Sequence, residues 1–344
     1  MANGSAQTEL TRMLTLTLTD QDLLRVRFAV SPLWETLALV RAHLSPVPGE
    51  PAVDRFVARH RPRLAAIDLS LLPDLLTHQG YVPDFLTPPP PGPSTDPEQP
   101  FADELDRLLA TPPEVVAREI GRVHRERPAA GPARALDRPD QVTRQLGAAV
   151  SRVWTAVLAP NWRRVRDILM ADVSARGRHL VAAGIEQVAG RLHPDITWRP
   201  GALMVRGPGT AVHHADGRGL LLVPSLFNGP HPTLLLDRPW QPALFYPARG
   251  RGDLARPAAE PSAALVTLLG RTRARLLAEA AAGVTTGAAA RRLGLAKGTV
   301  SEHLHALRDC GLIYPVRDGR FLRYELTATG AALTGPPAGG PSTR

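Results

Sequence analysis

The side chains best suited to chemistry lie together near the end of the sequence. If residues 297–309 form a helix, Val300, Leu304 and Leu307 share one apolar face. The opposite face then carries amino, hydroxyl, carboxylate, imidazole and guanidinium groups, on Lys297, Thr299, Glu302, His305 and Arg308. Such a mixture of hydrogen-bond donors and acceptors on one helix face can contact the base edges and phosphates of double-stranded DNA.

The flanking sequence predicts elements that would position this helix. Thr285 and Thr286 are good N-cap residues for a short preceding helix, and Gly294 is a good residue to end it. After Gly311 the apolar period changes to two, and the pair at 318–319, Asp-Gly, predicts a hairpin turn. Arginines surround this turn, namely Arg317, Arg320 and Arg323, with Arg320 at the tip.

One more helix is expected upstream, from about residue 263. Its apolar stripe comprises Leu265, Leu268, Leu269, Leu276 and Leu277. Its arginines, outside the stripe, are Arg271, Arg273 and Arg275. A helix–turn–helix followed by a hairpin with a basic tip is a winged helix, in which the helix enters the major groove and the hairpin reaches the minor groove or phosphates.

Other reactive side chains have less specific patterns. His213, His214 and Asp216 have side chains that can bind a metal ion. His193 and His231 are near in the sequence, but their spacing is not typical of a metal site. An exposed turn therefore explains His213, His214 and Asp216 better. Ser225 lacks the glycines of a nucleophile elbow. No catalytic residue, cofactor or metal is therefore expected, and the protein is not expected to be an enzyme.

Two interpretations stay open for Cys310 and for the tryptophans. Cys310 could be a redox switch, although a small buried residue at a helix end is the simpler reading. The tryptophans could line a ligand pocket or pack in the core, and they are Trp34, Trp154, Trp162, Trp198 and Trp240.

Length and composition exclude several classes of protein. The chain has 344 residues, 44% hydrophobic and 21% charged, which predicts two or three domains and excludes disorder throughout. A single cysteine excludes a disulfide scaffold. We find no apolar run of membrane-spanning length and no secretion signal at residues 1–8, so we expect no membrane association and a cytoplasmic location.

Positive charge is concentrated at the C-terminal end. The formal net charge is +9, and only one of the 41 basic residues, Lys297, is a lysine. GC-rich codon usage explains the many arginines better than phosphate recognition does. Residues 262–334 nevertheless hold ten basic and five acidic residues, a net charge of +5, which leaves +4 for the rest of the chain. A polyanionic partner should therefore bind this segment.

The sequence predicts an α+β fold that is mostly α. Alternating leucines predict a strand near residue 14, helices follow from Asp20 to about His193, and Ser31-Pro32 and Asn161 are expected helix starts. Short apolar runs between Ile196 and Tyr246 predict a small antiparallel unit packed on the helices. Proline-rich stretches at 87–100, 127–140 and 249–262 are expected to be an exposed connector, a loop and a domain boundary.

The sequence predicts four segments. Residues 1–250 form a mainly helical sensory or dimerisation domain with a β-rich end, 251–262 a linker, 263–330 the winged helix–turn–helix, and 331–344 a disordered tail.

The phrase AAARRLGLAKGTVSEHLHALRDCGLIYPVRDGRFLRYELTATG at 288–330 resembles the ArsR-type winged-helix transcriptional regulators. The resemblance covers the TVSEHL core, the LRDCGLI helix exit and the YELTATG ending. It implies a homodimer on a two-fold symmetric operator that represses until a signal releases it. Residues 1–250, through GLLLVPSLF and FYPARG, resemble a domain of unknown function that precedes such winged helices in actinobacterial-type sequences.

The resemblance also suggests DNA contacts. Thr299 and Ser301 match hydroxyl positions aimed at bases and phosphates, His303 matches the histidine of the family phrase, and Arg320 matches the wing tip. Glu302 departs from the pattern, because a carboxylate repels phosphate although it can accept a hydrogen bond from cytosine N4. The preceding helix lacks the cysteines of the metal-sensing branch, so a thiolate-bound metal is not expected as the signal.

We therefore expect a DNA-binding transcriptional regulator that responds to a signal, such as an unknown small-molecule effector. Base contacts are expected from Lys297, Thr299, Ser301, Glu302 and His305. Backbone and minor-groove contacts are expected from Thr286, Arg291, His303, Arg308, Arg317 and Arg320. The alternatives are an enzyme or small-molecule-binding protein with an accessory winged helix, and a protein-interaction adaptor.

Overall fold

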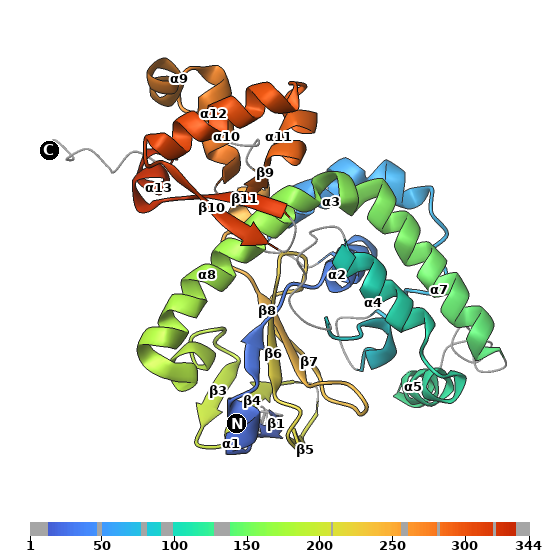
Figure 1. Ribbon diagram of the computed structural model, residues 1–344. Coiled ribbons are helices and arrows are strands. Elements are labelled where there is room, and N and C mark those ends of the chain that lie inside the picture. Colours follow the sequence, from blue (N-terminus) through green and yellow to red (C-terminus); the bar gives the residue numbers. More distant parts are fainter. Residues whose placement is uncertain are drawn as a thin grey trace, which may run out of the picture. The chain divides into compact units, whose positions relative to one another are not determined.

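The computed structural model describes residues 13–46, 50–76, 81–90, 99–126, 138–207, 209–255, 261–280, 283–318 and 321–334. The chain divides into two compact units, Met1–Ala255 and Arg256–Arg344 (Figure 1). The helices of the first unit are α1 (Asp20–Leu23), α2 (Pro32–Leu44), α3 (Pro51–Ala65), η1 (Asp84–Leu86), α4 (Gln99–Leu109), α5 (Pro113–Glu126), α7 (Pro139–Val153), η2 (Trp154–Leu158), α8 (Ala159–Ala189) and η3 (Arg251–Ala255). Its strands are β1 (Met13–Thr17), β2 (Val26–Phe28), β3 (Ile196–Arg199), β4 (Ala202–Arg206), β5 (Ala211–His214), β6 (Leu220–Ser225), β7 (Thr233–Leu235) and β8 (Ala243–Pro247).

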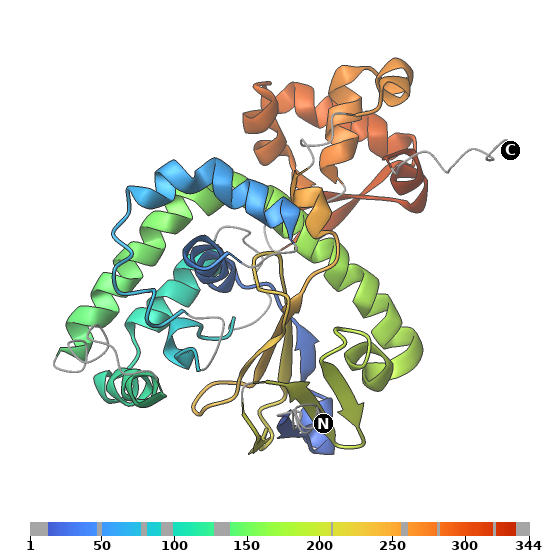
Figure 2. The ribbon, with the colours of Figure 1, turned by 180° about the vertical axis from the view of Figure 1, so that it is seen from behind.

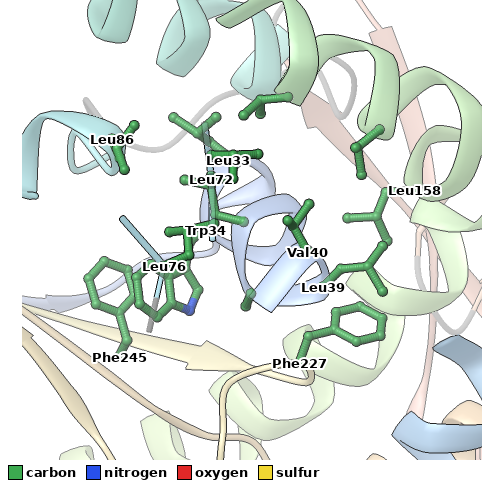
Figure 3. Close-up of a cluster of buried hydrophobic side chains, with 14 of the residues drawn as sticks. Leu33, Trp34, Leu39, Val40, Leu72, Leu76, Leu86, Leu158, Phe227 and Phe245 are labelled. Carbon is green, nitrogen blue, oxygen red and sulfur yellow. The ribbon is translucent and has the colours of Figure 1, made fainter. Parts of the chain in front are cut away.

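Helix α2 lies at the centre of the larger core in this unit. All residues from 32 to 41 are buried, and α2 contacts α3, α4, α7, η2 and strand β6. Figure 3 shows its side chains pointing outward in several directions, with the Trp34 ring against Phe245 at a centroid distance of 3.8 Å. A helix that is buried on all sides, and mainly apolar, is stable only when other elements surround it. The predicted start is confirmed, because Ser31 Oγ accepts a hydrogen bond from the backbone N–H of Trp34 at 3.0 Å.

The N-terminus of α2 is also held by a residue far along the chain. Glu104 of α4 is fully buried, and its Oε2 accepts hydrogen bonds from Ser31 Oγ at 2.9 Å and from the N–H of Leu33 at 2.8 Å. Burial raises the pKa of Glu104 to about 8, against the lowering effect of these hydrogen bonds. The carboxyl group is therefore largely protonated at neutral pH.

Helices α7, η2 and α8 follow one another without a loop. The predicted helix start at Asn161 is wrong, because Asn161 lies within α8 and its Nδ2 donates to the carbonyl of Val157 at 2.7 Å. A helix-capping residue type can also occupy a helix interior when its side chain bonds the preceding turn. Gly184, with φ of 77°, kinks α8 before the helix ends.

The strands form two four-stranded sheets, in the orders β3-β4-β1-β5 and β2-β6-β8-β7. Helices α2, α4, α5 and α7 gather to one side of these strands (Figure 1, Figure 2). The predicted small antiparallel unit is wrong in part. Strand β3 pairs antiparallel with β4, and β7 with β8, but β1 pairs in parallel with β5, and β6 pairs in parallel with both β2 and β8. Two strands from the start of the chain enter the sheets. The alternating leucines predicted β1 correctly, but β2 lies in a stretch that was expected to be helical, and local turn signals could not reveal the partners of either strand.

The proline-rich segments differ from their predictions. Thr87 is only 4% exposed and residues 88–90 are buried, so this start of the predicted connector is part of the packed unit. Residues 91–98 and 127–137 lie outside the described residues. The predicted linker is wrong at its start, because η3 belongs to the first unit and Arg251 is 7% exposed. In the described part of the chain, no helix is long and apolar enough to span a membrane.

The second unit has its own core and its own sheet. Its elements are α9 (Ala263–Leu269), α10 (Arg271–Ala280), β9 (Val284–Thr285), α11 (Thr286–Leu293), α12 (Lys297–Asp309), β10 (Ile313–Asp318), β11 (Phe321–Leu326) and α13 (Ala328–Thr334). The three strands pair antiparallel in the order β10-β11-β9. The predicted tail from residue 331 is wrong at its start, because α13 continues to Thr334, and residues 335–344 lie outside the description.

The single helix predicted from residue 263 is two helices. Gly270 has a φ of 77° and separates α9 from α10. Leu268 is 68% exposed, whereas Leu276 and Leu277 are fully buried. The break at Gly270 changes the helix direction, so the leucines no longer form one continuous stripe. The predicted helix boundary and the predicted place of Leu268 in the core are therefore both wrong.

Gly330 in α13 gives a prediction about the stability of this unit. A Cβ at Gly330 would lie 2.0 Å from the carbonyl oxygen of Leu312, a backbone atom that cannot move aside easily. We expect Gly330→Ala to lower the free energy of unfolding by about 1–3 kcal/mol, measured by thermal or urea unfolding of the full chain. Gly298→Ala is the control, since its Cβ would meet nothing within 4 Å. Equal stability of the two variants would contradict the expected clash.

Candidate nucleic-acid interface

Local capping signals in the sequence set both ends of α11 and the turn that leads into α12. Thr285 caps α11 as predicted, because its Oγ1 accepts from the N–H of Ala288 at 3.3 Å. Gly294 ends α11 with φ of 66° in the left-handed region, and the N–H of Leu295 returns to the carbonyl of Ala290 at 3.1 Å. The predicted bounds of α12 are confirmed, since the helix runs from Lys297 to Asp309.

Helix α12 has the two faces that its sequence predicts. Val300, Leu304 and Leu307 are buried in the core of the second unit. Five of the residues expected to contact DNA are exposed, namely Lys297, Thr299, Glu302, His305 and Arg308. Ser301 and His303 are half-buried at the sides of the helix. The exposed face can therefore offer both donors and acceptors to a ligand that lies along the helix.

Several arginines of this unit are paired with carboxylates. Arg308 donates to Asp309 Oδ1 at 2.7 and 2.9 Å. Arg292 lies 2.9 Å from Glu279, and Arg323 lies 2.8 Å from Glu325. The Arg308–Asp309 pair is exposed, and exposed pairs contribute little stability, so a phosphate could replace Asp309 as the partner of Arg308.

The hairpin brings the expected basic residues to different surroundings. Strands β10 and β11 pair from Ile313 with Leu326 to Asp318 with Phe321, which confirms the hairpin. Arg317 is exposed on β10. Arg323 is half-buried, and its side chain lies against Gly283, so it supports the sheet. Arg320, the predicted tip, lies outside the described residues.

Two other predicted contacts lie on α11, and one residue was overlooked. Thr286 is half-buried at the first position of α11, and Arg291 is exposed near its end. The sequence reasoning did not single out Gly298, which is exposed on the outward face of α12. A glycine inside a predicted helix was the available signal, because glycine destabilises helices.

The alternative metal site does not assemble. His213 and His214 are consecutive on β5, so their side chains point to opposite faces of the strand. His214 Nδ1 lies 2.6 Å from Thr17 Oγ1, and Asp216 forms an ion pair with Arg238 at 2.5 Å. Within the described residues, no group of three or more histidine, cysteine or acidic side chains could hold a metal ion.

The remaining candidates from the sequence are Ser225, Cys310 and the tryptophans. Ser225 is fully buried, and its Oγ accepts from the N–H of Asn228 at 3.0 Å. Cys310 is exposed, so the expectation that it is buried is wrong. Trp34 and Trp162 are buried in the core, and Trp154 stacks on Phe101 at 4.4 Å. Core packing therefore explains these three tryptophans.

The fold and this surface define a helix–turn–helix protein. The chain matches the IclR helix-turn-helix domain over residues 275–317, which include α11, α12 and the turn between them. Residues 117–252 match a family of unknown function, DUF5937. No curated protein and no solved structure matches the chain. The two family matches indicate a DNA-binding transcriptional regulator of the helix–turn–helix class.

The comparison does not support the ArsR-type assignment, because the matching domain model is of the IclR type. The ArsR-type resemblance and the IclR-type match both cover the turn and the second helix, which many helix–turn–helix domains have in common. The phrase at 288–330 therefore predicted the class of domain correctly, and the comparison supports the class without the ArsR type. The match to a family of unknown function assigns no activity to residues 117–252.

Proposed function

We propose that this protein is a sequence-specific transcriptional regulator that binds double-stranded DNA as a homodimer through a winged helix–turn–helix. The observation that carries this proposal is the exposed face of α12, whose donors and acceptors lie outside a core formed by Val300, Leu304 and Leu307. The three-stranded sheet β10-β11-β9 supports the winged form of the domain. The net charge of +5 over residues 262–334 favours a polyanionic partner.

In the proposed complex, α12 lies in the major groove. Lys297, Thr299, Ser301, Glu302 and His305 face the base edges. Thr286, Arg291, His303 and Arg308 contact the DNA backbone, which positions the helix but carries no sequence information. Arg317 on β10, and Arg320, which follows β10 in the sequence, reach the adjacent minor groove or its phosphates, where the negative potential favours arginine.

A homodimer would place two α12 helices in successive major grooves, about 34 Å apart. The operator would then be a pair of inverted half-sites. The first unit would transmit a signal by changing the spacing or mobility of the two helices, which changes the affinity for DNA and releases a repressor.

The first unit offers a place for a small-molecule signal. A groove of about 530 Å³ lies between the end of α8 and strand β3, and Arg191, Thr197 and Trp198 are among its lining residues. The groove is largely open to solvent, so it would cover a small ligand on one side only. A second cavity, beside Phe227 and Asn228, has room for one water molecule, at about 20 Å³. The groove is therefore the better candidate.

Fluorescence anisotropy of the full chain tests the proposed function. A labelled DNA fragment from upstream of the gene is compared with a shuffled fragment of the same composition, over a series of salt concentrations. We expect tight binding to the upstream fragment alone, which weakens as salt rises because phosphate contacts release counterions. Equal and weak binding to both the upstream and the shuffled fragments would contradict sequence-specific regulation from this site.

Lys297→Ala tests whether Lys297 contacts the DNA directly or whether only the overall positive charge of the protein attracts DNA. Lys297 is exposed at the first position of α12, and its ammonium group is well placed for DNA. We expect weaker binding, and, if the contact is to phosphate, a decrease of about 1 in the slope of log affinity against log salt. Arg178→Ala, on an exposed position of α8, removes the same charge and should leave both values unchanged. Identical effects of the two variants would argue against α12 as the DNA-binding element.

A further inference from the structure

Gly298 occupies a position in α12 where the fold has no use for a glycine. It lies within the helix, its φ is not in the left-handed region, and a Cβ built on it would meet nothing within 4 Å. Alanine would therefore fit without strain and would stabilise the helix, because glycine loses more conformational freedom on folding. Neither a turn nor close packing inside the unit explains this residue. A ligand that approaches the backbone closely would explain it.

Glu302 lies one helical turn after Gly298, on the same outward face. It is exposed, and its carboxylate forms no hydrogen bond or ion pair with another described residue. No lysine or arginine occupies the positions three or four residues away, which hold Gly298, Thr299, His305 and Ala306. The fold therefore does not engage this negative charge, although the surrounding unit is positively charged.

A carboxylate on a DNA-facing surface has few favourable partners. Phosphates repel it, so only a donor on a base edge can bind it in the major groove. Cytosine presents the N4 amino group there, and adenine presents the N6 amino group beside the N7 acceptor, which repels a carboxylate. Cytosine N4 is therefore the best partner for Glu302.

We propose that Gly298 and Glu302 act together as the specificity element of α12. The missing side chain at Gly298 lets the first turn of the helix lie close to the base edges, and this brings the Glu302 carboxylate within reach of the N4 amino group of a cytosine in each half-site. This inference rests on the proposed function. It adds the base that is recognised and the feature of the helix that permits the approach.

Glu302→Gln tests the choice of base. Glutamine keeps the size of the side chain and pairs with adenine through N6 and N7, so the preferred base at one position should change from cytosine to adenine. The full-length wild type and the variant each select binding sites from a library of random duplexes. We expect the two proteins to differ by about tenfold to a hundredfold in their cytosine-to-adenine preference at that position, with the other positions unchanged.

Asp309→Asn is the matched control. It makes the same change from acid to amide on the same face of α12, but at the end of the helix and on a carboxylate that Arg308 already contacts at 2.7 Å. Recognition helices read bases mainly with their N-terminal residues, so the motif selected by Asp309→Asn should equal that of the wild type.

Gly298→Ala tests the close approach with two measurements. Its melting temperature should equal or exceed that of the wild type, while its affinity for the selected site should fall about tenfold or more, because the added methyl group meets the base edges. Unchanged affinity would overturn the role of Gly298.

The selection experiment separates failure of this inference from failure of the proposed function. If the wild type selects a motif and Glu302→Gln selects the same one, the role of Glu302 is overturned while the proposed function stands. If the wild type itself selects no motif, the proposed function is overturned, and this inference with it.

Discussion

Arg251→Ala is expected to lower the free energy of unfolding of the first unit by about 3 kcal/mol. Arg251 follows β8 and is 7% exposed. Its guanidinium donates to Glu50 Oε1 at 2.7 Å and to the carbonyls of Ser225 at 3.3 Å and Asn228 at 2.5 Å. One side chain thus joins the residue that precedes α3, the end of β6 and the loop that follows β6.

The magnitude follows from what the substitution leaves behind. Removing one partner of a buried ion pair typically costs about 3–5 kcal/mol of stability. Arg251→Ala also leaves buried carbonyl groups without their hydrogen-bond donor, which adds to the cost. The lower end applies here, because Glu50 is 33% exposed and water can solvate its carboxylate. Urea unfolding of the full chain measures the effect. Arg249→Ala, two residues earlier and exposed, is the control and should change the free energy by less than about 0.5 kcal/mol. A similar loss for both variants would refute the role of Arg251.

Stability should also fall as the pH rises above neutrality. Glu35 and Glu104 are both fully buried, and burial raises the pKa of Glu35 to about 7 and that of Glu104 to about 8. In the unfolded chain both groups lose their protons near their ordinary pKa. Because the folded pKa values are raised, the stabilisation is complete below the ordinary pKa and is lost as the pH rises through about 7 and 8. Burial raises the pKa of Asp84 and Glu119 as well, which acts in the same direction.

The expected decrease in the free energy of unfolding is on the order of 3 kcal/mol between pH 6.5 and pH 8.5. Burial lowers the pKa of His43, His60 and His193 below the ordinary value of 6.5, so these groups act mainly below this interval, and at its lower end they oppose the decrease. Urea unfolding at several pH values provides the measurement. Glu104→Gln should remove a large part of the decrease, and the exposed Glu114→Gln should leave it unchanged. Stability that is constant or rising over this interval would contradict protonated carboxyl groups in the core.

The second unit could be predicted from the sequence in considerable detail because its signals are local. Thr285, Gly294 and the spacing of Val300, Leu304 and Leu307 define α11, the turn and α12, and the structure has each of them. Helix caps and a single amphipathic stripe depend on residues within about two turns of one another. The exposure of Lys297, Thr299, Glu302 and His305 follows from the same periodicity. Their contacts with DNA stay a prediction.

The fold of the first unit could be predicted less well, because it depends on contacts between segments that are distant in the sequence. Helix α2 has a clear start at Ser31, but only the structure reveals that Glu104 holds this start and that other elements surround the helix. Likewise, the β1–β5 and β2–β6 pairs join strands about 200 residues apart, so no turn signal announces them.

The sequence by itself thus determined the helix–turn–helix class of the second unit, the bounds of α12 and the side chains on its outward face. Only the tertiary structure decided the break at Gly270, the parallel pairing of the sheets and the burial of Glu104 and Arg251. The physical reason is the range of the interactions. Capping and helical periodicity act between neighbours in the chain, whereas strand pairing and the burial of a charge depend on which distant segments meet in the folded protein.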